Sequence, residues 1–154
     1  MLLPDFRDML SEFLDSEIDF LLVGAYAMAA HGYPRSTGDI DLWVRADPAT
    51  GPKTFSALSR FGAPLHDLAA SDLSQPGLVF QIGEPPIRID ILTMVSGLEF
   101  QEAWGNRMLV EWDGLTIPVL GLEDLIRNKR STGRNKDIAD AERLEQQRPQ
   151  SGSP

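Results

Sequence analysis

The sequence of 154 residues contains no cysteine and two histidines, and these absences exclude several kinds of site. Disulfide frameworks and thiolate chemistry require cysteine, and zinc sites are built mainly from cysteine and histidine. The absence of cysteine also fits a reducing compartment. A chain of this length can bury a core without crosslinks. We therefore predict a single domain over residues 1–147, followed by a polar, disordered tail at residues 148–154.

Positive charge is also scarce, because 14 Lys and Arg stand against 23 Asp and Glu, giving a formal net charge of −9. Proteins with a long nucleic-acid footprint neutralise many phosphates with Lys and Arg, so we expect no extended footprint here. Long hydrophobic runs are missing too. The longest uncharged stretch, residues 20–34, is too short to span a bilayer and is broken by Gly24, Gly32 and Pro34. Without a basic leader, the chain is expected to be cytoplasmic and to have no membrane partner.

The pattern of apolar residues predicts helices that alternate with strands. Spacings of three and four residues predict a first helix from Pro4 to Leu14, and alternation predicts a strand at Asp39 to Val44. The fold class is therefore α/β (α+β), with a mixed sheet flanked by helices and a helical C-terminus. The other expected strands are residues 19–23, 78–82, 87–93, 108–112 and 115–119, and the other expected helices are residues 25–30, 52–61, 100–104, 122–129 and 135–146.

Three aspartates are the sharpest candidates for chemistry. Asp39 and Asp41 are two residues apart in one strand, so they share a face and can converge on one ion. Asp90 can join them if its strand is a neighbour. Clustered carboxylates repel one another unless a cation compensates, and Mg²⁺ prefers such oxygen ligands. We therefore predict two Mg²⁺ ions, with Mn²⁺ as an alternative, held by Asp39, Asp41 and Asp90. A solvated strand face is the competing interpretation of an isolated Asp-x-Asp pair.

Basic residues are concentrated in one short segment. Residues 127–136 contain five Lys and Arg and no acid, in a chain that is otherwise acidic. A solvated helix surface is one interpretation, and counter-charge for a polyphosphate in the carboxylate cleft is the other. On the second interpretation all five cations face this cleft, and Lys129, Arg134 and Lys136 contact phosphate. Asp137 and Asp140 are then expected to orient these cations rather than to bind metal.

Two segments resemble a known family. Leu21-Leu22-Val23-Gly24-Ala25-Tyr26-Ala27, followed by Arg35-Ser36-Thr37-Gly38-Asp39-Ile40-Asp41-Leu42, is similar to the motif of the nucleotidyltransferase superfamily with the DNA polymerase β-like fold. Its Arg-x-Thr-x-Asp-x-Asp form most resembles the bacterial branch that includes AbiEii-type toxins. The segment from Lys129 to Asp140 is similar to the helix motif of that branch. The resemblance extends from about Leu21 to Leu144.

The resemblance implies a Mg²⁺-dependent transfer of NMP from an NTP onto a hydroxyl acceptor, which could be an RNA end, a protein or a small molecule. It implies that Asp39, Asp41 and Asp90 are catalytic. It also implies a toxin or antitoxin protein as a possible partner. The nucleotide would be contacted by a second set of residues near the N-terminal motif, namely Gly24, Ala25, Arg35, Ser36 and Thr37.

Two departures from the family pattern leave an alternative open. Ala25 stands where the family usually has serine or glycine, so the side-chain hydroxyl that would touch the phosphates is missing. The backbone N–H is retained, and Ser36 or Thr37 could supply a hydroxyl. Little chain follows Leu144, whereas many members carry a further helical domain for the acceptor. The alternative is a catalytically inactive protein of the same fold that binds a nucleotide or acts as an antitoxin-like partner.

Overall fold

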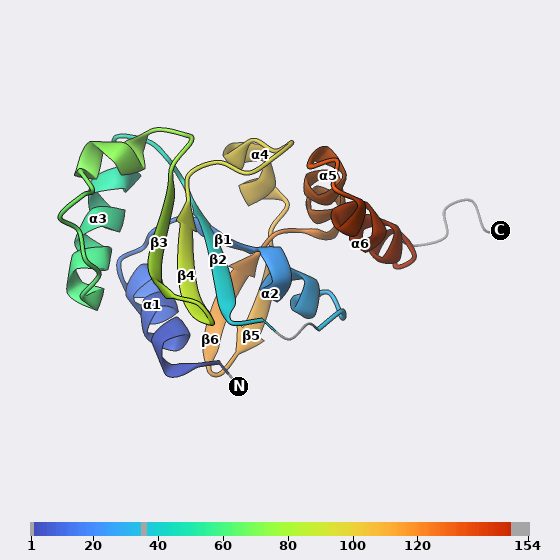
Figure 1. Cartoon of the computed structure of the whole chain (residues 1–154), viewed down its shortest axis with the longest axis horizontal. Helices are drawn as coiled ribbons and strands as arrows, with labels where there is room; N and C mark the ends of the chain where they lie inside the picture. The colour runs from blue at the N-terminus through green and yellow to red at the C-terminus, as the bar shows by residue number, and fades with distance from the viewer. Residues whose placement is uncertain (1, 35–36, 149–154) are drawn as a thin grey trace.

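The computed structural model describes residues 2–34 and 37–148, and within them one mixed sheet of six strands forms the centre of the molecule (Figure 1). The strand order is β3-β4-β2-β1-β6-β5. β2 pairs in parallel with β4 and antiparallel with β1, so β2 and β4 end side by side. The strands are β1 (Phe20–Val23), β2 (Asp39–Val44), β3 (Val79–Glu84), β4 (Ile87–Leu92), β5 (Met108–Trp112) and β6 (Leu115–Val119).

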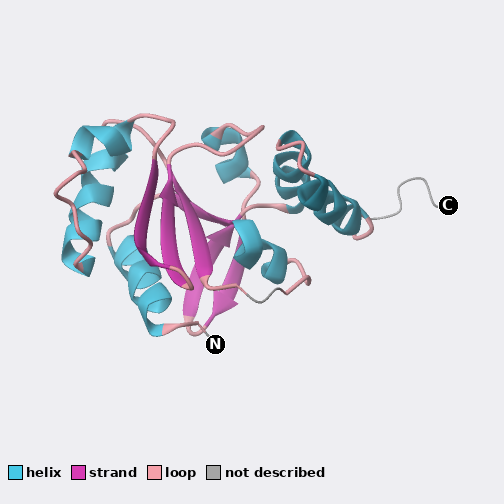
Figure 2. Ribbon diagram, viewed as in Figure 1, coloured by secondary structure: helices cyan, strands magenta, loops and turns pink. Residues whose placement is uncertain are grey.

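Helices lie on both sides of this sheet (Figure 2). Figure 1 shows α1 and α3 on one side, and α2, α4, α5 and α6 on the other. The first side encloses the larger apolar core, and the second contains the polar cleft described below. The helices are α1 (Pro4–Asp15), α2 (Gly24–Ala30), α3 (Thr50–Phe61), α4 (Phe100–Gly105), α5 (Leu122–Ser131) and α6 (Asn135–Glu145).

The helix and strand patterns of the sequence account for this arrangement. In α1, Phe6, Met9, Leu10 and Phe13 recur on one face and are buried, as the spacing predicts. In β2 the alternating side chains Ile40, Leu42 and Val44 enter the core, which leaves the aspartates on the opposite face. The fold class predicted from the sequence is therefore confirmed.

The differences from the predicted elements are local. The segment between the predicted helix at residues 52–61 and the predicted strand at residues 78–82 was expected to form a loop, but it includes a short 3₁₀ helix, η1 (Ala70–Ser74), whose Leu73 is buried. The carboxylate of Asp72 accepts a hydrogen bond from the backbone N–H of Ala69 and closes this turn. Such a short element has no periodicity to detect. No helix in the described part of the chain is long and apolar enough to cross a membrane, and the tail at residues 149–154 lies outside that part.

Candidate active site

The three aspartates are brought together by the pairing of β2 with β4. The register places Asp41 beside Asp90 and Asp39 beside Arg88 on these parallel strands. Alternation then sends the side chains of Asp39, Asp41, Arg88 and Asp90 to the same face of the sheet. The condition that the sequence left open, that the strand of Asp90 neighbours that of Asp41, is therefore met.

Arg88 supplies positive charge inside this cluster. Its Nε donates to Asp90 Oδ1 at 2.8 Å, and its Nη2 donates to Asp90 Oδ2 at 3.1 Å and to Asp39 Oδ2 at 3.1 Å. The fork of the guanidinium thus holds Asp90 bidentately and joins it to Asp39. Asp41 has no such bond to Arg88 among the described contacts, so it is the least compensated of the three carboxylates.

The pKa of Asp41 reflects this imbalance. Burial is the main cause, and together with the neighbouring charges of Asp90 and Asp39 and a hydrogen bond with Asp90 it raises the pKa of Asp41 from 3.8 to about 7. The charge of Arg88 acts in the opposite direction but does not offset these effects. Near neutral pH, the carboxyl group of Asp41 is therefore expected to be partly protonated when no further cation is present.

Gly24 fits closely against Asp41. Val23, the last residue of β1, pairs with Asp41 across the antiparallel strands, and Gly24 follows with φ of 67°. A Cβ atom at this position would lie 2.2 Å from Asp41 Oδ2. Both the backbone conformation and the missing side chain are needed here, since a left-handed φ and such a close approach favour glycine. The glycine thus brings backbone directly against the carboxylate cluster.

Residues around this glycine account for part of the predicted nucleotide site. Ala25 and Thr37 both line the same cleft as the aspartates. The Thr37 hydroxyl accepts a hydrogen bond from the backbone N–H of Asp39 at 3.1 Å, which fixes the start of β2. Arg35 and Ser36, which were also predicted to contact the nucleotide, lie outside the described residues.

A cleft of about 670 Å³ lies above the aspartates, and the turn between α5 and α6 closes its opposite side. Lys129, Arg134 and Lys136 line it, but Arg127 and Arg130 do not. These two arginines line a separate depression on the far side of α5, where Arg130 pairs with Glu145. The expectation that all five cations face the cleft is therefore wrong, because residues three apart on α5 project together to its other face.

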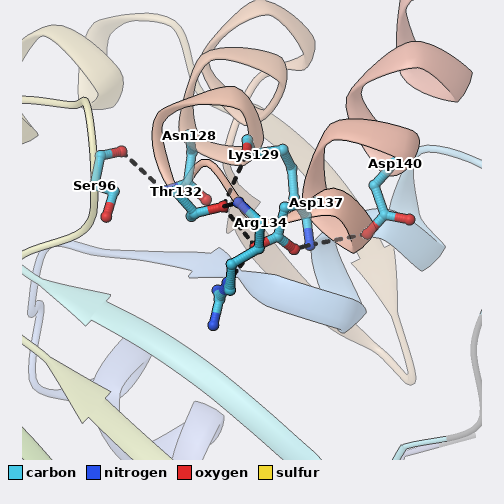
Figure 3. A network of polar contacts seen from close by, with 7 residues as sticks. All are labelled: Ser96, Asn128, Lys129, Thr132, Arg134, Asp137 and Asp140. Carbon is cyan, nitrogen blue, oxygen red and sulfur yellow. Dashed lines mark hydrogen bonds and ion pairs between the residues drawn. The ribbon is translucent and has the colours of Figure 1, made fainter.

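The turn is held by a network centred on Asp137 (Figure 3). Asp137 Oδ2 accepts from the Thr132 hydroxyl at 2.7 Å and from Arg134 Nε at 2.8 Å. Lys129 Nζ lies 3.4 Å from Asp137 Oδ1 and 3.2 Å from Asp140 Oδ2. Burial acts to raise the pKa of Asp137, but the Thr132 hydrogen bond and the charges of Lys129 and Arg134 hold it below its usual value. The prediction that Asp137 and Asp140 contact the cations is confirmed.

The three cations that line the cleft therefore differ in their exposure and in their ion pairs. Lys129 is 12% exposed and enclosed by two buried carboxylates, so it mainly neutralises them. Arg134 is 75% exposed, and its side chain extends away from both helices although its Nε is anchored to Asp137 (Figure 3). Lys136 is exposed and makes no ion pair within residues 2–34 and 37–148. Arg134 and Lys136 are the groups best placed to meet a bound anion.

The carboxylate oxygens of the three aspartates are the kind of ligand that a divalent cation prefers, but their present arrangement is not that of a metal site. Within residues 2–34 and 37–148, no three acidic or histidine side chains stand in a geometry that could hold a metal ion. Arg88 accounts for this, since it bonds oxygens of both Asp39 and Asp90. Three carboxylates on adjacent strands, one with a pKa near 7, nevertheless form a site that added positive charge would stabilise.

The groups that organise the cleft have no clear signal in the sequence. The bond of Arg88 to Asp39 follows from a strand register that the sequence does not reveal. Asn128 was not singled out, yet its Nδ2 donates to the Ser96 carbonyl at 2.9 Å and fastens α5 to the segment after β4 (Figure 3). An Asn amid basic residues gives no signal for such a contact.

Carboxylates on two neighbouring strands, with a glycine beside them and a basic helical turn opposite, define a nucleotidyltransferase fold. A match to a family model identifies the family within this class. Residues 3–152 match the family described as "Nucleotidyl transferase of unknown function (DUF2204)". The chain belongs to this family. None of the curated proteins matches it.

Solved structures share this fold at low sequence identity. A protein from Thermotoga maritima, assigned as a nucleotidyltransferase, is 17% identical with a TM-score of 0.62, covering 96% of this chain and 97% of its own. The lincosamide antibiotic adenylyltransferase LnuA, solved with lincomycin, is 16% identical with a TM-score of 0.59, covering 94% and 97%. The antibiotic-resistance factor ANT(2'')-Ia is 16% identical with a TM-score of 0.62, covering 91% and 80%. The closeness to AbiEii-type toxins is not confirmed by these matches.

Proposed function

We propose that the protein transfers NMP from an NTP to the hydroxyl group of an acceptor, using divalent cations held by Asp39, Asp41 and Asp90. The observation that carries this proposal is the pairing of Asp41 with Asp90 across β2 and β4, directly beside Gly24 and opposite the basic turn. The family membership supports the reaction class. The solved antibiotic adenylyltransferases support a hydroxyl-bearing acceptor by analogy of fold.

The cations would supply Lewis-acid stabilisation of the charge that develops on the phosphates. For Asp39 and Asp90 to hold such cations, Arg88 would have to give up oxygens of both carboxylates, and Asp41 would have to be ionised. Arg134 and Lys136 would contact the phosphates from the opposite side of the cleft. Lys129 supports this contact by neutralising Asp137 and Asp140, so its predicted role at the nucleotide becomes indirect.

The reaction itself is an in-line displacement at the α-phosphorus. The acceptor oxygen forms a bond to this phosphorus, and the bond to the bridging oxygen of the β-phosphate breaks. Pyrophosphate leaves with that electron pair. The carboxylate of Asp90 takes the hydroxyl proton, because it lies at the end of the cluster that is farthest from Gly24 across the sheet.

Transfer of label from α-labelled NTPs tests the proposal. The purified protein is incubated with Mg²⁺, each NTP and, separately, total RNA, cell protein and a small-molecule extract. We expect labelling of one acceptor class, with at least a hundredfold loss in the Asp39→Asn/Asp41→Asn double variant. Asp67→Asn, at a carboxylate 93% exposed and remote from the cleft, is the matched control and should retain activity. Absence of transfer, or transfer undiminished in the double variant, contradicts the proposal.

Ala25 favours a second candidate, a protein that binds a nucleotide without turning it over. It lines the cleft but offers no hydroxyl to a phosphate. Such a protein could act as a partner in a toxin–antitoxin pair, the role suggested by the sequence resemblance. Calorimetry with Mg²⁺ and each NTP separates the candidates: binding without transfer to any acceptor favours the second. An Ala25→Ser variant that gains transfer would identify the missing hydroxyl as the cause.

A further inference from the structure

The residues of the cleft form a row that crosses four strands of the sheet. The two ends of this row differ, and we assign one end to each substrate of the proposed reaction. In the strand order β3-β4-β2-β1, Val23 pairs with Asp41, Asp41 pairs with Asp90, and Asp90 pairs with Gln81 on the edge strand β3. Neighbouring strands are about 4.8 Å apart, so roughly 14 Å separates the glycine end of this row from the edge of the sheet. The aspartates lie between these two ends.

The helices that carry the basic turn contact both α2 and the segment after β4. The Tyr33 hydroxyl, which follows α2, donates to the carbonyl of Arg143 on α6 at 2.8 Å. His31, at the end of α2, bonds through Nε2 to the Leu120 carbonyl at 2.8 Å, just before α5, and Asn128 on α5 bonds to Ser96. Gly24 therefore marks the phosphate end of the aspartate row. Because in-line displacement places the entering and leaving oxygens on opposite sides of phosphorus, a triphosphate at Gly24 would leave the acceptor to approach from the side of Asp90 and β3.

The β3 side of the cleft has a different chemistry. Val79, Leu92, Met94 and Val95 line it and form an apolar shelf beyond Asp90. Val79 and Met94 are each 58% exposed, and they are two of the five large hydrophobic side chains that the described residues leave exposed. Exposed apolar side chains that cluster in a cleft commonly mark a binding surface.

The shelf is held in place before any ligand binds. The backbone N–H of Thr93 donates to the Leu78 carbonyl at 3.1 Å, and the N–H of Leu78 donates to the Thr93 hydroxyl at 2.8 Å. Asn128 fastens the following segment to α5 through the Ser96 carbonyl. A preformed surface loses little conformational entropy on binding, which favours its use as a recognition element.

The distribution of charge in the cleft further restricts the chemical class of the acceptor. Among the described residues that line the cleft, Ser96 and Asn128 are the polar neighbours of the shelf, and the charged groups belong to the aspartate cluster or to the basic turn. Nothing on the shelf would compensate a phosphate or an ammonium group. The whole cleft, at about 670 Å³, is within the range of roughly 300–1,000 Å³ typical of small-molecule sites, and the nucleotide must share it.

We propose that the acceptor is a small hydroxyl compound whose body is apolar and uncharged, and that this body lies on the Val79–Met94 shelf with its hydroxyl directed to Asp90. The inference rests on the proposed function and specifies its acceptor. An RNA end, a protein side chain and a polycationic alcohol are the competing acceptors that the test separates from it.

A homologous series of n-alkyl glucosides, used below their micelle concentrations, tests the shelf in two ways. Binding is followed through the ¹³C-labelled methyl group of Met94, assigned with Met94→Leu. We expect its resonance to shift, with affinity rising up to about fourfold per added methylene group. Transfer of labelled NMP onto the same compounds should rise in parallel. Val79→Glu should lower both at least tenfold, while Leu109→Glu, at a side chain 60% exposed on the opposite edge strand, should change neither.

The possible failures are distinguishable. Transfer to RNA, protein or tobramycin that is unaffected by Val79→Glu, without a Met94 shift from the glucosides, overturns the shelf and leaves the proposed function standing. If binding and transfer do not depend on the length of the alkyl chain, the assignment of the shelf as the acceptor site is likewise overturned. If the unmodified protein binds no NTP and transfers no label to any acceptor, the proposed function itself is overturned. Thermal unfolding of each variant establishes that it is folded, and Val79→Thr provides a smaller perturbation if Val79→Glu is not.

Discussion

Replacement of Asp41 by asparagine should stabilise the metal-free protein, and increasingly so as the pH rises. Asn has the shape of the protonated carboxyl group and can donate the same kind of hydrogen bond to Asp90, but it cannot ionise. In the wild-type protein the pKa of Asp41 rises from 3.8 to about 7 on folding. The folded state therefore binds more protons than the unfolded state between these values, and stability falls as the pH increases through this window.

The magnitude follows from the same two values. One pKa unit corresponds to about 1.36 kcal/mol, so a rise from 3.8 to about 7 corresponds to a total of roughly 4 kcal/mol in the free energy of unfolding. The stabilising contribution of the protonated group is fully present below pH 3.8 and is lost above about pH 7. Between about pH 5 and pH 8, the stability advantage of Asp41→Asn over wild type should widen by roughly 2–3 kcal/mol.

Urea unfolding with a chelator present, at both pH values, measures this difference. Titrating groups remote from Asp41 contribute equally to both proteins, so the change in the difference reports on Asp41 together with the carboxylates beside it. Millimolar Mg²⁺ should shrink the difference at high pH, because a ligand that binds only the ionised wild-type site stabilises it. A stability difference that stays constant between the two pH values would contradict the raised pKa of Asp41.

Further substitutions test the remaining features of the cleft. Gly24→Ala should destabilise the fold by about 1–2 kcal/mol in urea unfolding and reduce transfer, because its φ is 67° and its Cβ would lie 2.2 Å from the Asp41 carboxylate. Arg88→Met should strengthen Mn²⁺ binding in an electron paramagnetic resonance titration, and weaker binding would show that Arg88 supports the site. Lys129→Ala should lower stability by about 3 kcal/mol, because it removes the ammonium group that lies between the buried carboxylates of Asp137 and Asp140. Lys136→Ala should leave urea unfolding unchanged and weaken NTP binding in calorimetry.

The local parts of the structure could be predicted from the sequence, because period and turn chemistry act over a few residues. The strand at Asp39 to Val44 and the hairpin around Asp113-Gly114 appear with the expected bounds. The shared face of Asp39 and Asp41 follows from alternation alone. Their approach to Asp90 required a pairing between strands that are separated by about a third of the chain, and no local pattern reveals such a register.

The distribution of charge illustrates the same limit. Helical spacing predicts that Arg127 and Arg130 project together, but only the packing of α5 determines that this side faces away from the cleft. The apolar shelf escaped notice because Val79 and Met94 look like ordinary core residues in the sequence. The exposure of Val79 depends on β3 being the edge of the sheet, which is a property of the whole topology.

The charge balance of the cleft explains how an acidic protein can accommodate a nucleotide. The net charge of the chain is −9, yet the carboxylates at the cleft are matched in number by the cations of Arg88 and the basic turn. A triphosphate alone would upset this balance, whereas a triphosphate that brings divalent cations adds little net charge. If such cations bind the aspartates, as proposed, Arg88 would be released from oxygens of Asp39 and Asp90. The same guanidinium that bonds the carboxylates in this structure would then remain in the cleft as positive charge for a bound triphosphate.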